Sequence, residues 1–354
     1  MPSLRRAGLV AGLAIAPIAA AVRFAHVYRT RAGFPYRRAP RFSPADLGLP
    51  YETTFVASPA GRLPAWFIPA RGGQPGPGVV LVHGWDSARD RTLPTAAFLH
   101  AAGFHILTFD VRGNGANPAE VLPLSTGEYG ADAAAAFEAL LARSEVTRGA
   151  ILGHSMGGSG AILAAAGDPR VGAVVSVSAP SDPRRMVHQT FRLAHLPFPA
   201  PVAAPLAWLT SRVYVRPRGH ELRAISARHA VARYAGPTLV AHGRDDPIMP
   251  VEHARRIARA AIAARRGTAA PAAVQLHIVG TGGHSWSYED VAYRRTVAAF
   301  LARELGGPLS PEGAAEAAAA VDARRLPEPE AEIVGDRAAG PAGAMLGRSS
   351  PREP

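Results

Sequence analysis

Short apolar runs recur along the middle of the chain, and segments with helical spacing lie between several of them. Residues 79–82 and 171–177 are almost wholly apolar, as expected of strands buried on both faces of a sheet. Strands are predicted over residues 51–57, 62–68, 79–82, 104–109, 149–152, 171–177, 237–241 and 274–279, and helices over residues 129–142, 158–166 and 252–265. Because strands that alternate with helices build a mostly parallel sheet with helices on both faces, the pattern predicts an α/β fold.

Composition divides the chain into four parts, which are residues 1–33, 34–50, 51–305 and 306–354. Residues 51–305 carry the alternating pattern and form the predicted domain, residues 34–50 are rich in Pro and Arg and are predicted to be a linker, and residues 306–354 are a low-complexity tail. We expect most of this tail to be disordered, apart from one helix over residues 310–324 with Ser310 as its N-cap. Residues 181–234 interrupt the alternation with large apolar side chains and arginines, so we expect them to form an inserted cap.

The first 33 residues contain an apolar run, from residue 7 to residue 22, that has no charged side chain. Six arginines and no acidic residue follow it by residue 41. Because arginines resist translocation, we interpret residues 1–33 as an uncleaved membrane anchor that contacts lipid and keeps the catalytic domain in the cytoplasm. Two alternatives stay open: a signal peptide cleaved near Ala19–Ala21, which would export the protein, and an amphipathic or disordered leader.

The formal net charge of +12 suggests an acidic partner, but the distribution of charge argues against nucleic acid. All 39 basic residues are arginines, and they are scattered rather than interleaved with aromatic residues in one stripe. The absence of cysteine excludes disulfides, a thiol nucleophile and cysteine-based metal sites. No H-E-x-x-H motif, phosphate-binding loop or dinucleotide fingerprint occurs, so no metal and no cofactor is expected.

The segment Gly153–His154–Ser155–Met156–Gly157 has the pattern G-x-S-x-G between a predicted strand and a predicted helix. A serine at the apex of such a sharp turn projects away from the backbone, and the flanking glycines remove side chains that would clash. The following N–H group, that of Met156, then points toward the oxyanion of a tetrahedral intermediate. This context predicts that Ser155 is a nucleophile.

A serine nucleophile needs a base and a group that orients the base. His284 follows the last predicted strand on a Gly-rich loop, and we expect it to be the base. Asp245 and Asp246 follow the strand before it, and we favour Asp246 as the orienting acid because it precedes the turn Pro247–Pro250. The resulting chain order of serine, aspartate and histidine is that of the α/β-hydrolase elbow.

The loop after residues 79–82 should supply the second oxyanion donor. It reads His83–Gly84–Trp85, and the backbone N–H of Trp85 is the candidate that would face the N–H of Met156. We expect His83 to support this loop by hydrogen bonding rather than to react.

From about residue 50 to residue 305 the chain resembles the α/β-hydrolase superfamily, and within it the bacterial serine hydrolases related to the prolyl-oligopeptidase catalytic domain. The motifs that carry the resemblance are His83–Trp85, Asp110–Gly115, Gly153–Gly158, Gly243–Pro247 and Gly283–His284. One position departs from the family's usual D-x-R-G-H-G, because Asn114 stands where the histidine is expected. The resemblance implies the α/β-hydrolase fold and the triad Ser155, Asp246 and His284, and it leaves the substrate open.

The leading hypothesis is a serine hydrolase that cleaves a carboxylic ester or a related acyl compound through an acyl-enzyme. An acyltransferase, thioesterase or peptidase would use the same triad, and a membrane-attached binding protein on a hydrolase scaffold would use none of it. The large apolar side chains of the cap favour an apolar acyl substrate, although they could simply pack the cap onto the domain. Its arginines, Arg184 and Arg212 among them, could face lipid headgroups or an acidic substrate.

Overall fold

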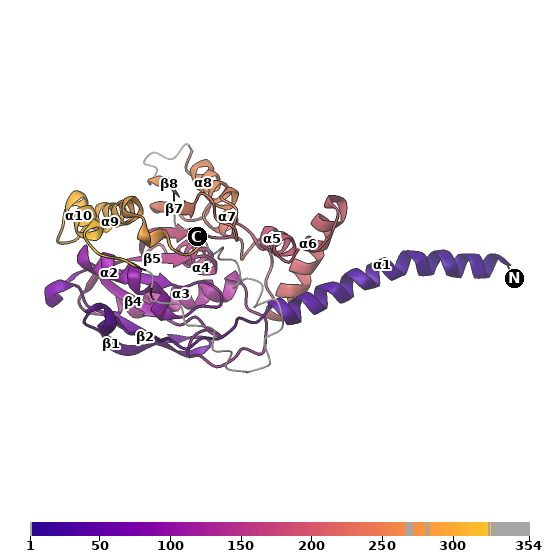
Figure 1. Cartoon of the computed structure of the whole chain (residues 1–354), viewed down its shortest axis with the longest axis horizontal. Coiled ribbons are helices and arrows are strands. Elements are labelled where there is room, and N and C mark those ends of the chain that lie inside the picture. Colours follow the sequence, from indigo (N-terminus) through magenta and orange to yellow (C-terminus); the bar gives the residue numbers. More distant parts are fainter. Residues whose placement is uncertain (1, 267–271, 281–282, 325, 327–354) are drawn as a thin grey trace, which may run out of the picture.

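Eight strands form one sheet in the computed structural model, which describes residues 2–266, 272–280, 283–324 and 326. Along the sheet the strands are ordered β1-β2-β4-β3-β5-β6-β7-β8 (Figure 1). The strands are β1 Glu52–Ser58, β2 Gly61–Ile68, β3 Gly76–Val82, β4 His105–Phe109, β5 Val146–His154, β6 Val171–Val177, β7 Thr238–Gly243 and β8 Val274–Val279. Strands β1 and β2 pair antiparallel, β2 pairs antiparallel with β4, and all further neighbours are parallel. The expected mostly parallel sheet is confirmed.

Helices cover both faces of this sheet because successive side chains of each central strand point to opposite sides. Val80 and Val82 of β3 join a core beneath α3, α4, α7 and α8, whereas Val79 and Leu81 join a second core beneath α2, α9 and α10. The helices are α1 Pro2–Ala32, α2 Leu93–Ala101, α3 Thr126–Leu141, α4 Met156–Gly167, α5 Pro183–Leu193, α6 Ala200–Val215, α7 Ala227–Ala230, α8 Glu252–Arg265, α9 Val291–Leu305 and α10 Pro311–Ala319.

The predicted element boundaries agree well where apolar residues define them and less well where glycine does. Strands β6 and β8 and helix α8 have the predicted bounds. Strand β3, by contrast, begins at Gly76, before the predicted start at residue 79, because the Gly76 N–H donates to the Glu145 carbonyl and extends the ladder toward β5. Helix α10 starts after Ser310, whose hydroxyl accepts the Gly313 N–H, and residues 327–354 of the predicted tail lie outside the described residues.

The cap between β6 and β7 is built from α5 and α6 and packs against the C-terminal part of α1 (Figure 1). The Phe24 ring meets the rings of Phe191 and Phe198 edge to face, at centroid distances of 5.5 and 5.4 Å. The Tyr28 hydroxyl bonds the Thr190 hydroxyl at 2.5 Å. The last part of the predicted cap, residues 227–234, belongs instead to the sheet-facing core around Ala230.

No helix in the described part of the chain is long and apolar enough to cross a membrane. Residues 1–33, the predicted anchor, correspond to α1, whose last turns carry Arg29 and Arg31 and whose aromatic side chains pack against protein.

The segment predicted as a linker, residues 34–50, lies along the domain and is bound to it through backbone N–H groups. The Tyr36 N–H donates to Asp86 at 2.5 Å, and the Arg41 N–H donates to Asp90 at 2.9 Å. Directly before this segment, the Gly33 carbonyl accepts the Leu124 N–H at 2.8 Å. The chain is thus held at several points between α1 and β1.

Candidate functional site

Ser155 stands at the junction of β5 and α4 in a strained conformation, with φ of +53°. Such an angle is rare for a residue with a side chain and persists only where the surroundings impose it. A Cβ at Gly153 would lie 2.1 Å from the Gly157 carbonyl oxygen, and one at Gly157 would lie 2.4 Å from the Val82 carbonyl oxygen. The two flanking positions of the motif therefore require glycine, and the elbow brings Ser155 to the carboxyl edge of the sheet.

The structure brings the three predicted triad residues together. The Nε2 atom of His284 lies 3.1 Å from the Oγ atom of Ser155, and its Nδ1 atom lies 2.7 Å from Oδ2 of Asp246. The residues come from the ends of three different strands, β5, β7 and β8. Ser155 and Asp246 are buried, with 8% and 7% of their surface exposed. Gly283 and His284 are described, whereas residues 281–282 of the predicted Gly-rich loop lie outside the described residues.

Asp246 is held as an ionised acceptor by groups that surround both of its oxygens. Oδ1 accepts the N–H groups of Ile248 and Met249 at 2.9 and 2.8 Å. Burial opposes its ionisation, but the imidazoles of His242 and His284 and the Met249 N–H outweigh this and hold the Asp246 pKa well below its usual range. The neighbouring Asp245 is exposed. Of the two adjacent aspartates, Asp246 is the one that contacts the histidine.

Two histidines that the sequence did not single out position these groups. His154 Nε2 lies 2.6 Å from the backbone carbonyl of His284, and the two rings meet edge to face at 4.9 Å. Burial, followed by the charge of His284, lowers the pKa of His154 to about 4, so His154 is neutral near pH 7. His242 Nε2 lies 3.3 Å from Asp246 and 2.6 Å from the Met249 carbonyl. Only the tertiary arrangement reveals these contacts, since His154 occupies a variable position of the serine motif and His242 lies just before the motif Gly243–Pro247.

The loop after β3 lies against the elbow, as the predicted second oxyanion donor requires. A Cβ at Gly84 would stand 3.2 Å from the Cβ of Ser155, so the backbones of the two loops are in close approach. His83 supports this loop: Nδ1 donates to the Gly84 carbonyl at 2.7 Å, and Nε2 accepts the Val111 N–H at 3.0 Å. Trp85 follows directly on this loop, and Met156 is the first residue of α4, where the leading N–H groups have no acceptor within the helix.

The side chains of the motif Asp110–Gly115 stabilise the neighbouring loops rather than contributing to the catalytic site. The buried carboxylate of Asp110 accepts the backbone N–H groups of Arg89 and Ala116 at 2.7 and 2.9 Å, and it pairs with the Arg89 guanidinium. Arg112 pairs with the buried Asp132 of α3. Asn114, where the family usually has histidine, donates from Nδ2 to the Arg112 carbonyl at 3.1 Å. These contacts assign the motif a structural role.

Asp86 follows the predicted oxyanion donor and joins the N-terminal segment to the site. Its φ is +51°, and its carboxylate accepts the Tyr36 N–H at 2.5 Å. Burial raises the pKa of Asp86 to about 6. Sequence reasoning missed this residue, because its contact with Tyr36 depends on how residues 34–50 pack against the domain.

We expect the variant Asp86→Asn to gain stability relative to the wild type as the pH rises. An aspartate in an unfolded chain has a pKa of about 3.9. Because folding raises this value, the wild type loses stability as the pH increases from about 4 to about 7, whereas the neutral amide loses none. Urea unfolding of both proteins at the two ends of this window measures the difference. An equal difference in the free energy of unfolding at both pH values would contradict the prediction.

Sequence comparisons match the chain to one family model and to several proteins. A family model described as serine aminopeptidase, S33, matches residues 73–228. An uncharacterized protein of Mycobacterium tuberculosis (strain H37Rv) is 29% identical over 212 residues, which cover 59% of this chain and 66% of that protein. The chain thus spans slightly less than two thirds of that relative's length. A protein of Variovorax paradoxus named as a carbamate hydrolase is 28% identical over 64% of this chain and 92% of its own.

Solved structures show the same fold at low identity. An esterase of Pyrococcus furiosus superposes with a TM-score of 0.59 at 22% identity, covering 77% of this chain and all of its own. An acylaminoacyl peptidase of Pyrococcus horikoshii superposes with a TM-score of 0.55 at 17% identity, covering 75% of this chain and 44% of its own. The sheet order, the serine elbow and these likenesses together identify the chain as a member of the α/β-hydrolase superfamily with the α/β-hydrolase fold.

Proposed function

We propose that this protein is a serine hydrolase that cleaves a carboxylic ester or a related acyl compound, with Ser155, His284 and Asp246 as its catalytic residues. The observation that carries the proposal is the continuous hydrogen-bonded chain from Asp246 through both nitrogens of His284 to the Ser155 hydroxyl. A serine hydroxyl is a weak nucleophile at neutral pH, and a base at hydrogen-bond distance removes this weakness. The named activities of the V. paradoxus relative and the P. furiosus esterase support the same class of reaction.

In the proposed reaction, the Ser155 Oγ attacks the acyl carbon while its proton passes to Nε2 of His284. Asp246 accepts the Nδ1–H group throughout, so the imidazole keeps the tautomer that leaves Nε2 free to accept a proton. The carbonyl oxygen becomes an oxyanion, and the backbone N–H groups of Met156 and Trp85 are the proposed donors to it. Each such donor contributes on the order of 3 kcal/mol of transition-state stabilisation.

Collapse of the tetrahedral intermediate breaks the bond to the leaving alcohol, which takes the proton from His284. A water molecule then gives a proton to the same nitrogen and attacks the acyl-enzyme, which releases the carboxylic acid and restores the Ser155 hydroxyl. His154 takes no proton in this scheme. Because its pKa is lowered to about 4, it holds the His284 backbone without placing a second positive charge beside the imidazolium.

Covalent labelling tests the assignment of the nucleophile. We expect a fluorophosphonate probe to add to the full-length wild type at the peptide that carries Ser155, as mapped by mass spectrometry. The variant Ser155→Ala should stay unlabelled. Ser159→Ala is the matched control, because Ser159 lies on the same helix but donates its hydroxyl to the Pro180 carbonyl at 2.8 Å. A wild type that resists the probe would favour a binding protein on a hydrolase scaffold.

A peptidase is the second candidate, because the matching family model is described as a serine aminopeptidase. The two candidates differ in the bond that breaks, not in the residues that break it. Turnover of a p-nitrophenyl ester should be compared with turnover of the p-nitroanilide that has the same acyl group. The ester proposal predicts that kcat/KM for the ester exceeds kcat/KM for the anilide by more than the difference in intrinsic reactivity between the two substrates. Comparable values would assign the protein to the peptidases.

A further inference from the structure

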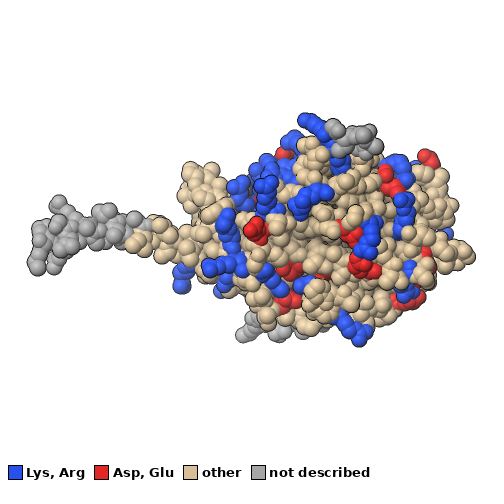
Figure 2. Space-filling model, turned by 180° about the vertical axis from the view of Figure 1, so that it is seen from behind, with Lys and Arg blue, Asp and Glu red and all other residues tan. Residues whose placement is uncertain are grey.

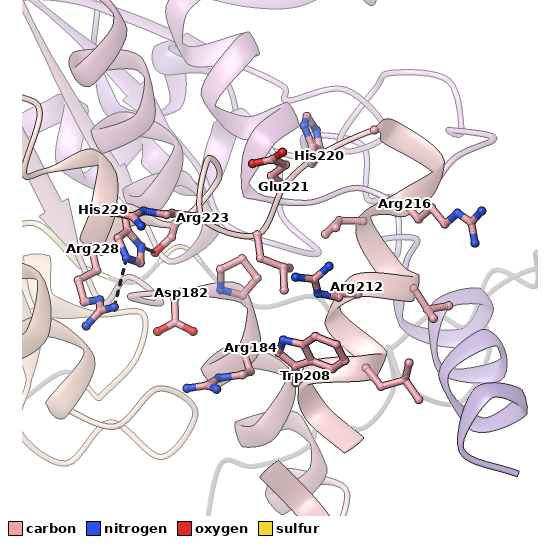
Figure 3. A pocket seen from close by; sticks show the side chains of 17 residues that line it. Asp182, Arg184, Trp208, Arg212, Arg216, His220, Glu221, Arg223, Arg228 and His229 are labelled. Atoms are coloured by element: carbon pink, nitrogen blue, oxygen red, sulfur yellow. Dashed lines mark hydrogen bonds between the residues drawn. The ribbon is translucent and has the colours of Figure 1, made fainter. Parts of the chain in front are cut away.

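The cap contains an open pocket of about 870 Å³ that is separate from the proposed catalytic residues. It lies between the start of α5, one side of α6 and the loop that leads to α7 (Figure 3). Five arginines line it, together with the indole of Trp208: Arg184, Arg212, Arg216, Arg223 and Arg228. Neither Ser155 nor His284 belongs to its lining.

The positive charge of this pocket is poorly compensated. Within the described residues, none of these five guanidinium groups forms an ion pair with a carboxylate, and Arg212 stacks over the Trp208 ring at 4.6 Å instead. The lining contains two acidic residues, Asp182 and Glu221. Asp182 is already engaged, because it caps α5 through the Arg185 N–H and pairs with the Arg185 side chain. Burial, followed by the charges of Arg228 and Arg223, lowers the pKa of the lining residue His229. The pocket is therefore suited to an anion.

The wall opposite α6, which bears Arg223 and Arg228, is fixed to the body of the protein and is not a free loop. His220 Nε2 lies 2.5 Å from the Glu128 carboxylate at the start of α3. The Ile225 carbonyl accepts the Thr126 hydroxyl at 2.7 Å, and the Ser226 hydroxyl donates to the Ser181 carbonyl at 3.1 Å. These bonds tie both ends of the loop to elements of the sheet domain.

Exposed apolar side chains lie on α6, which lines the pocket, and on the neighbouring helix α1. Trp208 and Val202 of α6 are 44% and 47% exposed, and Ile15 and Ile18 on the neighbouring α1 are 63% and 65% exposed. Arginines gather on the face of the cap beside the stem of α1 (Figure 2). Basic side chains around an exposed indole and aliphatic groups are the combination that interfacial membrane binding requires, since the arginines meet anionic headgroups and the apolar groups enter the acyl boundary.

We propose that the arginine pocket of the cap is a docking site for anionic phospholipid headgroups at a membrane surface. The guanidinium groups bind headgroup phosphates, and Trp208 lies at the boundary between headgroups and acyl chains. The protein would thus attach peripherally, through the cap and α1. The proposal is independent of the catalytic chemistry, because it concerns binding alone.

Vesicle sedimentation of the full-length protein tests this docking site. The test compares vesicles of phosphatidylcholine with vesicles that also contain phosphatidylglycerol, and it uses Ser155→Ala as the background so that no lipid is hydrolysed. We expect binding to the anionic vesicles that weakens with added salt. Replacing Arg184, Arg212 and Arg216 by glutamine should weaken this binding on the order of a hundredfold, because each arginine near an anionic surface contributes roughly a fivefold effect.

The matched control replaces Arg62, Arg148 and Arg324, which are exposed on other elements, and so removes the same charge. It should weaken binding by only a few fold, and melting temperatures of both triple variants check that they are folded. Equal losses of vesicle binding in the two triple variants would overturn the proposal, because net charge rather than the pocket would then determine binding. Undiminished binding by the pocket variant, or equal binding to both vesicles, would assign attachment to α1 and also overturn it. Stabilisation of the wild type by inorganic phosphate without vesicle binding would replace the membrane by a soluble anion.

Discussion

Replacement of Ser155 by alanine is expected to lower kcat/KM for a p-nitrophenyl ester by about a millionfold, the effect that removal of a serine nucleophile has elsewhere. The loss should be this large because no second hydroxyl stands at hydrogen-bond distance from His284 Nε2 among the described residues. Only the rate that oxyanion donors and substrate binding sustain alone should remain. Steady-state kinetics of the purified variant, followed by burst-phase measurements of the wild type, provide the comparison.

Ser159→Ala is the control for this variant too, since it removes a hydroxyl from the next turn of α4 without touching the histidine. Its kcat/KM should stay within a few fold of the wild type. Ester turnover by Ser155→Ala at the wild-type rate would show that the reaction does not pass through this serine, whatever the geometry of the elbow.

Replacement of Asp246 by asparagine should lower kcat by about ten-thousand-fold while leaving the site almost unchanged in shape. The amide can still accept the N–H groups of Ile248 and Met249 through one oxygen. If its NH₂ group faces His284 Nδ1, the imidazole must accept there and carry its proton on Nε2, where it cannot take the serine proton. The negative charge that stabilises the imidazolium is lost as well.

Asp245→Asn is the matched control for Asp246→Asn, because it makes the same chemical change at the exposed neighbour. Its kcat should equal that of the wild type. Crystal structures or chemical-shift measurements of the His284 ring would show whether the tautomer has changed in Asp246→Asn. A larger loss in Asp245→Asn than in Asp246→Asn would reverse the assignment of the acid.

The fold and the candidate triad could be predicted because both depend on local patterns. The run before Ser155 and the small residues after it encode strand, turn and helix within about twenty residues, and buried parallel strands are recognisable by their uniform apolar character. Gly76 shows the limit of such patterns, since glycine has no hydrophobic signature and its strand hydrogen bond to Glu145 depends on a partner strand far along the chain.

The supporting residues could not be predicted in the same way. His154 occupies a variable position of the serine motif and Asp86 belongs to no motif, and their roles depend on backbone groups 130 and 50 residues away. Their protonation depends on burial, which no local pattern specifies. The N-terminal apolar run shows the same difficulty, because a lipid bilayer and the aromatic side chains of the cap are both apolar surroundings for a helix. In the structure, Phe24, which follows the run, packs against the cap, whereas Ile15 and Ile18 within the run are exposed.

By itself, the sequence determined the α/β fold, the order of the strands along the chain, and the order of serine, aspartate and histidine. It did so because hydrophobic periodicity and turn residues act over short distances. Only the tertiary structure decided that Asp246 rather than Asp245 contacts His284, that His154 holds the His284 backbone, and that five arginines share one pocket. These features depend on side chains brought together by the packing of the whole domain, across 129 residues between Ser155 and His284.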